Sequence, residues 1–129
     1  MKFDKDYFTG QTFTAEELNK YRKAVAHCIT VAKKNDDRDV KFHFAYMALI
    51  KIGIYFLAKA GYRIKSRPGH HIKIIEALSV LLNDDDIIII GDKMRKDRNL
   101  DFYSSDNMIT NKETDEYMAF VEKLYKRML

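Results

Sequence analysis

The longest apolar segment of the chain, residues 37–60, reads DRDVKFHFAYMALIKIGIYFLAKA. Its apolar side chains recur at intervals of three and four residues, which is the spacing of one face of an α-helix. Gly61 follows the segment directly, at the position where glycine commonly ends a helix. The pattern predicts a long central helix with a wide buried face, in which Gly53 would let a neighbouring element pack close.

Four further helices are expected around the central one. The chain has one proline and five glycines in 129 residues, a composition that favours long helices over strands and turns. The first helix would begin after Thr14, an N-cap residue followed by the acidic residues Glu16 and Glu17. The others are expected at about 70–82, at about 84–103 and after a polar loop at 104–111, whereas residues 61–69 are expected to form a loop.

Residues 87–90 are four consecutive isoleucines, which by propensity favour a β-strand. The sequence offers no second strand, and an isolated strand could not satisfy its backbone hydrogen bonds. The preceding run, Asn83-Asp84-Asp85-Asp86, instead supplies an N-cap and an acidic first turn. We therefore predict a helix here, with a buried stripe that consists of Ile88, Gly91, Arg95, Arg98 and Phe102.

These elements predict an all-α fold, an up-and-down bundle of about five helices. A length of 129 residues with 47% hydrophobic residues suits one domain, residues 14–129, preceded by an N-terminal extension, residues 1–13. The single cysteine, Cys28, lies in an apolar helical stripe, where it would be buried and reduced. The N-terminus lacks the apolar stretch of a signal peptide, and the apolar runs are too short to span a bilayer. We expect a cytoplasmic protein without a membrane partner.

The net charge of +4 is a mild excess that by itself indicates no partner. Its distribution is more informative. Basic residues crowd two short segments, residues 63–67 and residues 93–98. These two local patches are the electrostatic evidence for an anionic partner.

The second basic segment carries the most specific arrangement of polar side chains. On a helix, Arg95, Arg98 and Asn99 project from one side, with the phenol of Tyr103 nearby. A guanidinium matches the geometry of a phosphate and can bind it through two hydrogen bonds. The spacing allows a phosphate-binding surface. The alternative is structural, with both arginines paired to acidic neighbours and Phe102 in the core.

The adjacent histidines His70 and His71 resemble a metal-binding pair only superficially. Neighbouring residues on a helix point about 100° apart, which suits joint ligation badly. We expect no metal and no cofactor. Our interpretation is that these residues begin a helix and that one of them bonds a backbone group or a carboxylate.

Two blocks of residues, on an all-helical background, together resemble the HEPN family of small helical proteins. The first block is Arg98-Asn99 followed by Tyr103, where the family has an Arg-Asn pair followed by His or Tyr. The second block is Gly61-Tyr62-Arg63 followed by Arg67-Pro68-Gly69-His70-His71, which leads into an apolar helix. The resemblance extends from about Thr14 to the end of the chain and implies the same helical fold.

The resemblance also implies a function and a set of partners. HEPN proteins form dimers in which the motif arginine and histidine cleave RNA at the subunit interface, and some are paired with a minimal nucleotidyltransferase in toxin–antitoxin systems. It therefore implies a homodimer that acts on RNA or a nucleotide, with Arg98 and Tyr103 at the catalytic positions. Tyr103 also resembles the tyrosine that receives a nucleotide from such a partner. The ligand-binding residues that we expect are Arg95, Arg98, Asn99, Tyr103, Arg63 and Arg67.

The sequence departs from the family pattern where Tyr103 stands in place of the motif histidine. An unperturbed phenol titrates near pH 10, so it is a poor base at neutral pH. The sequence therefore leaves open whether the protein is a ribonuclease or a degenerate form that retains phosphate binding. The other hypothesis is a catalytically inactive helical domain that mediates protein–protein interaction.

Overall fold

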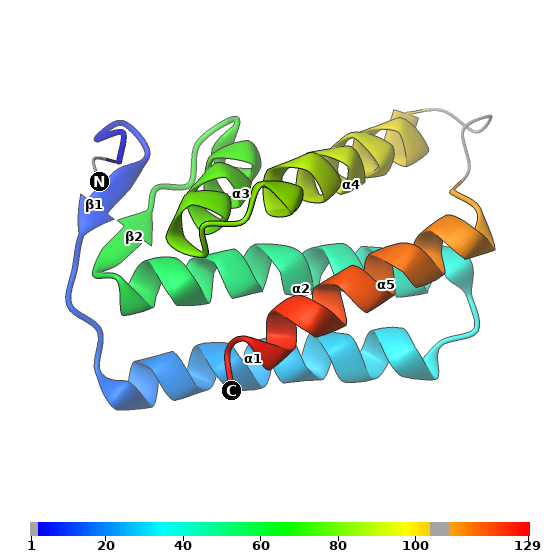
Figure 1. Cartoon of the computed structure of the whole chain (residues 1–129), viewed down its shortest axis with the longest axis horizontal. Helices are drawn as coiled ribbons and strands as arrows, with labels where there is room; N and C mark the ends of the chain where they lie inside the picture. Colours follow the sequence, from blue (N-terminus) through cyan, green and yellow to red (C-terminus); the bar gives the residue numbers. More distant parts are fainter. Residues whose placement is uncertain (1–2, 104–108) are drawn as a thin grey trace.

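The computed structural model describes residues 3–103 and 109–129, including every side chain in these ranges except those of residues 100–103. Within them the chain forms five helices and one small sheet, so the predicted all-α bundle is confirmed (Figure 1). The elements in chain order are β1 (Phe8–Gly10), α1 (Ala15–Lys34), α2 (Arg38–Lys59), β2 (Tyr62–Ile64), α3 (His70–Leu81), α4 (Asp85–Tyr103) and α5 (Asn111–Lys126).

Helix α2 is the centre of the bundle, as its apolar pattern predicts. It contacts each of the other helices and β2. In Figure 1, α1 runs beside it on one side, α3 and α4 lie on the other, and α5 crosses in front. Its side chains supply the largest fully buried residues of the core, among them Tyr46, Leu49, Ile52 and Tyr55. Gly53 lets α3 approach closely, because a Cβ there would collide with Ile74 Cγ2.

Helix starts follow the capping signals in the sequence. The Thr14 hydroxyl accepts a hydrogen bond from the Glu17 amide, and the Glu17 carboxylate accepts one from the Thr14 amide. Asp37 caps α2 through the Val40 amide. Each cap satisfies amide groups that a helix N-terminus leaves without a partner. These contacts confirm the predicted starts of the first two helices.

The four isoleucines of residues 87–90 are helical, as predicted. The predicted buried stripe of α4 is confirmed at Gly91 and wrong at Ile88 and Arg95. The buried positions are Ile87, Gly91 and Met94, whereas Ile88 and Arg95 are only partly covered. Because residues 87–90 are all isoleucine, the sequence does not show which of them faces the core. Packing against α3 determines the buried face. As a result, Arg95 and Arg98 lie at the edge of the buried face, with their charged ends free to reach the surface.

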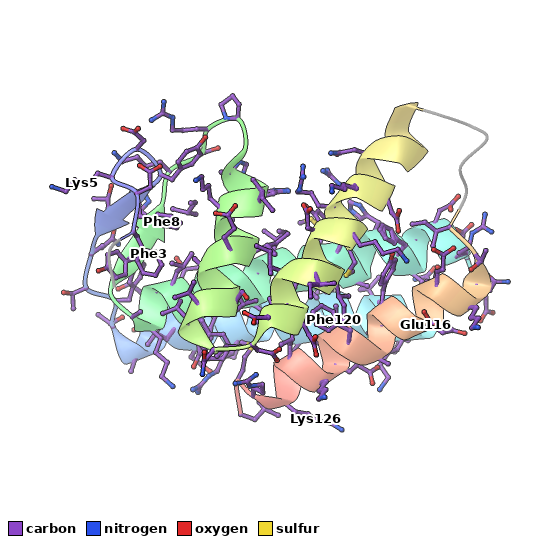
Figure 2. The ribbon with its side chains drawn as sticks, turned by 45° about the horizontal axis from the view of Figure 1, so that its top comes forward. Phe3, Lys5, Phe8, Glu116, Phe120 and Lys126 are labelled. Atoms are coloured by element: carbon purple, nitrogen blue, oxygen red, sulfur yellow. The ribbon has the colours of Figure 1, made fainter. Side chains whose placement is uncertain are left out.

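The N-terminal segment and the connection after α2 form a small sheet that the sequence did not reveal. β1 and β2 pair antiparallel, with Phe8 opposite Ile64 and Gly10 opposite Tyr62. Phe8 is buried, and Phe3 packs on Phe8 and Tyr62 (Figure 2). The prediction of a loop throughout residues 61–69 was therefore wrong for β2, and residues 3–10 pack against the helical domain.

Helix α2 is also long and apolar enough to cross a membrane by length and composition, with 22 residues and a mean hydropathy of 1.4 over its most apolar window. However, 56% of that window is buried inside the protein. Such burial is consistent with the central helix of a soluble bundle.

Candidate functional site

A groove of about 520 Å³ lies between the start of α3 and the C-terminal half of α4. The two helices diverge from the turn that joins them (Figure 2). One wall of this α3–α4 groove is formed by residues 66–72, and the other by Arg95, Arg98 and Asn99. The groove therefore brings together parts of the two blocks of sequence that carry the family resemblance.

The first wall is held by the N-terminal segment. The Tyr7 hydroxyl donates a hydrogen bond to the Pro68 carbonyl at 3.0 Å, and Arg67 Nη1 donates to the Asp6 carbonyl at 2.8 Å. The Arg67 guanidinium also lies over the Tyr7 ring, with its central carbon 5.6 Å from the ring centroid, close enough for a cation–π contact. Gly69 has a φ of 82°, a left-handed conformation that glycine adopts without strain. These contacts fix the path of the chain into α3.

Both histidines line the groove, and each has one nitrogen occupied. His70 Nδ1 lies 2.8 Å from the Arg67 carbonyl oxygen, which confirms the prediction that one histidine bonds a backbone group. His71 Nδ1 lies 2.9 Å from the hydroxyl of Tyr46. Burial, with the nearby charges of His70, Arg98 and Arg95, lowers the pKa of His71 to about 4, so this imidazole is neutral at pH 7.

The Tyr46 side chain links the core to the groove. It is fully buried, and burial raises its pKa to about 12 although Arg98 and Arg95 act in the opposite direction. At neutral pH the phenol therefore keeps its proton and can donate it to His71 Nδ1. The guanidinium of Arg98 lies over the Tyr46 ring, with its central carbon 5.3 Å from the ring centroid. Tyr46 thus supports both His71 and Arg98.

The second wall contains two arginines in different environments. Arg95 Nε donates to Asp92 at 2.9 Å, and Lys96 approaches the same carboxylate at 3.2 Å. Burial alone would raise the pKa of Asp92, but the hydrogen bonds and charges of these two cations outweigh it and lower the pKa. The structural alternative is therefore confirmed for Arg95. Arg98, by contrast, pairs with no carboxylate among the described side chains.

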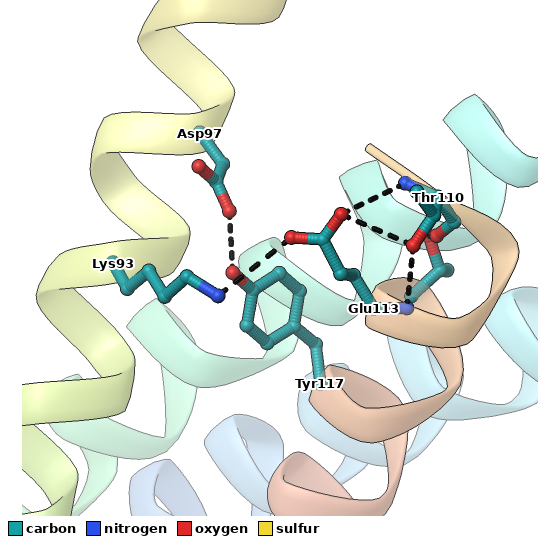
Figure 3. A network of polar contacts seen from close by, with 6 residues as sticks. Lys93, Asp97, Thr110, Glu113 and Tyr117 are labelled. Atoms are coloured by element: carbon teal, nitrogen blue, oxygen red, sulfur yellow. Dashed lines mark hydrogen bonds and ion pairs between the residues drawn. The ribbon is translucent and has the colours of Figure 1, made fainter. Parts of the chain in front are cut away.

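Contacts between α4 and α5 fix the position of the second wall (Figure 3). The Tyr117 hydroxyl donates to Asp97, and Lys93 forms an ion pair with Glu113 at 3.6 Å. Burial and the Asp97 carboxylate both raise the pKa of Tyr117, so its phenol stays protonated as a donor. Asp97 immediately precedes Arg98, so this network holds the backbone of α4 beside the groove.

The remaining predicted site residues lie elsewhere. Arg63 is exposed on β2 and lines a separate depression of about 390 Å³ with Thr9, Gln11 and Lys65. Tyr103 is the last residue of α4, and the predictions that concern its side chain and that of Phe102 lie outside the described residues. Of the six predicted ligand-binding residues, the structure brings together Arg67, Arg95, Arg98 and Asn99.

The sequence interpretation missed His70, His71 and Tyr46 as parts of the site. The polar atoms of His71 and Tyr46 lie on faces that are otherwise apolar, and this is the signal that could have identified these two residues. No group of three His, Cys, Asp or Glu side chains that could hold a metal ion occurs among the described residues. No family model, curated protein or solved structure matches the chain.

Proposed function

We propose that the chain is a HEPN-type module that binds RNA or nucleotide phosphates in the α3–α4 groove. One observation carries the proposal: Arg95, Arg98 and Asn99 meet the segment from Arg67 to His71 across a single groove. These residues come from two distant parts of the sequence, and both parts carry the resemblance to the family. A volume of about 520 Å³ is within the usual range of small-ligand clefts.

The start of α3 adds a second group of donors for an anion. Its N-cap is Gly69, which makes no side-chain hydrogen bond to the first turn, and that turn contains no acidic residue. The first amide groups of a helix lack partners within the helix, and they favour negative charge. Of these amides, that of His70 donates to the Arg67 carbonyl at 3.1 Å, which leaves the following ones for a ligand. A helix N-terminus of this kind commonly binds phosphate. Here it lies opposite Arg98, whose guanidinium can form two parallel hydrogen bonds to a phosphate.

The proposal includes the assembly and the partners that the family resemblance implies. The protein would be a cytoplasmic homodimer in which the Arg98 helices of both chains face a shared cleft. It would act within a toxin–antitoxin pair, with a minimal nucleotidyltransferase as its partner and Tyr103 as the acceptor of a nucleotide. The partner would then control access to the groove from the end of α4.

The alternative function is an inactive helical domain that binds another protein. Two large apolar side chains support it, since Val80 is 55% exposed and Ile89 is 66% exposed. Single exposed apolar residues are, however, normal on protein surfaces. The groove therefore supports the phosphate-binding function better.

The Arg98→Gln variant tests the proposal, because glutamine keeps much of the side-chain length and removes the charge. We expect RNA binding to weaken by about 1–3 kcal/mol, the usual contribution of a charge-assisted hydrogen bond. The slope of log affinity against log salt concentration should also become shallower, because a protein with one phosphate contact fewer releases fewer counterions when it binds. Fluorescence anisotropy with a labelled single-stranded RNA at several salt concentrations measures both quantities.

Lys126→Gln provides the matched control, since it removes one exposed positive charge from α5 (Figure 2), outside the residues that line the groove. The RNA affinity of Lys126→Gln should stay close to that of the original protein. The melting temperature of each variant separates binding from folding. A destabilised Arg98→Gln protein with unchanged RNA affinity would show that Arg98 only stabilises the bundle, and the proposed site would be rejected.

A further inference from the structure

The small sheet has one face toward the core and one toward solvent. Phe8 is buried, and it lies on the inner face. Thr9, the next residue, is exposed and lies opposite Arg63 in the register, so the side chains of both lie on the outer face. The Lys65 amide donates to the Tyr7 carbonyl, which continues the pairing beyond β2 and places the Lys65 side chain on the same face as Arg63. The outer face of the sheet therefore carries two exposed positive charges beside a hydroxyl.

The two cations of this face have N–H donors to offer a ligand. Arg63 forms no hydrogen bond or ion pair with any described residue. Lys65 Nζ donates to the Lys5 carbonyl at 2.9 Å, a contact that orients the ammonium and does not neutralise its charge. A guanidinium and an ammonium each carry several donors, so most of those on Arg63 and Lys65 remain free.

The depression that Arg63 and Lys65 line adjoins the α3–α4 groove. Ser66 lines both hollows, and the next residue, Arg67, lines the groove. Figure 1 shows α3 between the sheet and α4. The outer face of the sheet, the segment that leads into α3 and the groove therefore follow one another across the surface.

The two adjoining hollows share a lining of one charge sign. No carboxylate lines either of them, although the chain has 19 acidic residues. Two other depressions of the described surface are lined by carboxylates as well as by cations. A continuous field of one sign attracts a polyanion and concentrates it at the surface. The positively charged side chains that line the two hollows are Arg63, Lys65, Arg67, Arg95 and Arg98.

We propose that the outer face of the sheet is a second phosphate-binding site, the sheet subsite, and that one nucleic acid strand runs from it past Ser66 into the α3–α4 groove. The groove end of this path rests on the proposed function, whereas the sheet subsite rests on Arg63 and Lys65. A ligand that contacts both Arg63 and Arg98 needs phosphates at separate points along its length. A strand has such phosphates, and a mononucleotide does not.

The sheet subsite contacts phosphate alone. No aromatic side chain lines its depression, so a base has no ring there on which to stack. Phosphate contacts hold a strand in place without reading its sequence. The subsite therefore contributes equally to the binding of RNA and of single-stranded DNA.

The Arg63→Gln variant tests the sheet subsite, because it removes a charge from a side chain that has no contact to lose within the described structure. The probe is a labelled oligothymidylate of about twelve nucleotides, a length within the usual range of single-strand sites. We expect its affinity, measured by fluorescence anisotropy, to weaken by about 3–10-fold. The slope of log affinity against log salt concentration should fall by about 0.7, the value for one phosphate contact on a single strand. An oligouridylate of the same length should lose affinity by the same factor.

Lys20→Gln is the matched control, since it removes one exposed charge from α1, outside both hollows. It should bind the oligothymidylate as the original protein does. A thymidine dinucleotide, used as a competitor at low salt, should occupy the groove alone. Its affinity should fall in Arg98→Gln and stay unchanged in Arg63→Gln, and an equal loss in both variants would overturn the separate subsite.

The two variants also distinguish failure of the sheet subsite from failure of the proposed function. Unchanged oligothymidylate affinity in Arg63→Gln, with weaker binding in Arg98→Gln, would overturn the subsite and leave the groove as the binding site. Weaker binding in Arg63→Gln alone would support the subsite and reject the groove. A loss that affects RNA and spares DNA would overturn the inference that the subsite contacts only phosphate.

Discussion

At the scale of single residues, Tyr46 shows how a core side chain can determine the chemistry of a surface groove. Its ring is fully buried among apolar side chains, while its hydroxyl reaches His71 and its face contacts Arg98. A phenylalanine would fill the same volume but would leave His71 Nδ1 without its donor. The hydroxyl therefore fixes the tautomer of His71.

The depressed pKa of His71 predicts a loss of stability in mild acid. Its pKa is about 4 in the folded protein and about 6.5 in the unfolded chain, so between these values the unfolded chain binds more protons. The contribution of neutral His71 to the free energy of unfolding is therefore fully present above pH 6.5, and it is lost as the pH falls toward 4. Allowing for solvent screening of this partly exposed ring, we expect a loss of about 1–2 kcal/mol in the free energy of unfolding.

The His71→Asn variant isolates this contribution, because the amide oxygen can accept the Tyr46 hydroxyl and does not titrate. Urea unfolding of both proteins at pH 7 and pH 5 measures the difference. The carboxylates with lowered pKa values, Asp92 and Glu113, are common to both proteins, so their contributions cancel. The same pH dependence in both proteins would contradict the depressed pKa of His71.

At the scale of elements, the close approach of α2 and α3 depends on Gly53. An added Cβ would meet Ile74 Cγ2, and Ile74 is 1% exposed, so it has little room to move. Alanine favours a helix over glycine by up to about 1 kcal/mol, but crowding in a packed core costs about 1–3 kcal/mol. Since α3 also carries one wall of the groove, this contact bears on the site as well as on the fold.

We therefore expect Gly53→Ala to lower the free energy of unfolding by about 1–2 kcal/mol, as measured by urea titration. Gly10→Ala is the matched control, because an added Cβ there meets nothing within 4 Å. A double-mutant cycle that combines Gly53→Ala with Ile74→Ala tests whether the contact with Ile74 causes the destabilisation. In that background the added methyl has space, so Gly53→Ala should no longer destabilise. A cost that persists without Ile74 would place the strain elsewhere.

The elements also show what a sequence can reveal about a fold. The long helices were predictable because caps such as Thr14 and Asp37 and the apolar spacing of α2 favour the same structure. The strands β1 and β2 have three residues each, too few for an alternating pattern to appear. Their pairing depends on contacts between distant segments, such as Phe8 with Ile64. Short sequence patterns carry little information about contacts of this kind.

At the scale of the whole molecule, the site is a product of topology. The turn between α3 and α4 sends the two helices apart, so the start of one lies opposite the C-terminal half of the other. The sequence identified Arg98 and Asn99 by spacing and Arg67 by local charge. It could not reveal that His70 and His71 face them, nor that Arg63, only four residues before Arg67, lines a different depression. Arg63 and Arg67 line different depressions because of the direction in which the chain leaves β2.

The last prediction concerns the dimer. In the proposed assembly, which the family resemblance implies, the Arg98 helices of two chains face a shared cleft across a two-fold axis, the usual symmetry of homodimers. We expect sedimentation equilibrium to show a dimer at micromolar concentration. The arrangement also brings like charges from both chains near one another, and their repulsion opposes association. An anion in the cleft should relieve that repulsion.

Two consequences distinguish this dimer from one that uses another face. Addition of a single-stranded 2′-O-methyl RNA oligonucleotide should raise the dimer fraction at a fixed protein concentration, because bound phosphate screens the facing arginines. Arg98→Gln should strengthen the ligand-free dimer while it weakens RNA binding, since it removes one positive charge from each side of the cleft. A dimer that Arg98→Gln leaves unchanged would place the interface elsewhere. A strict monomer at micromolar concentration would restrict the site to the groove of a single chain.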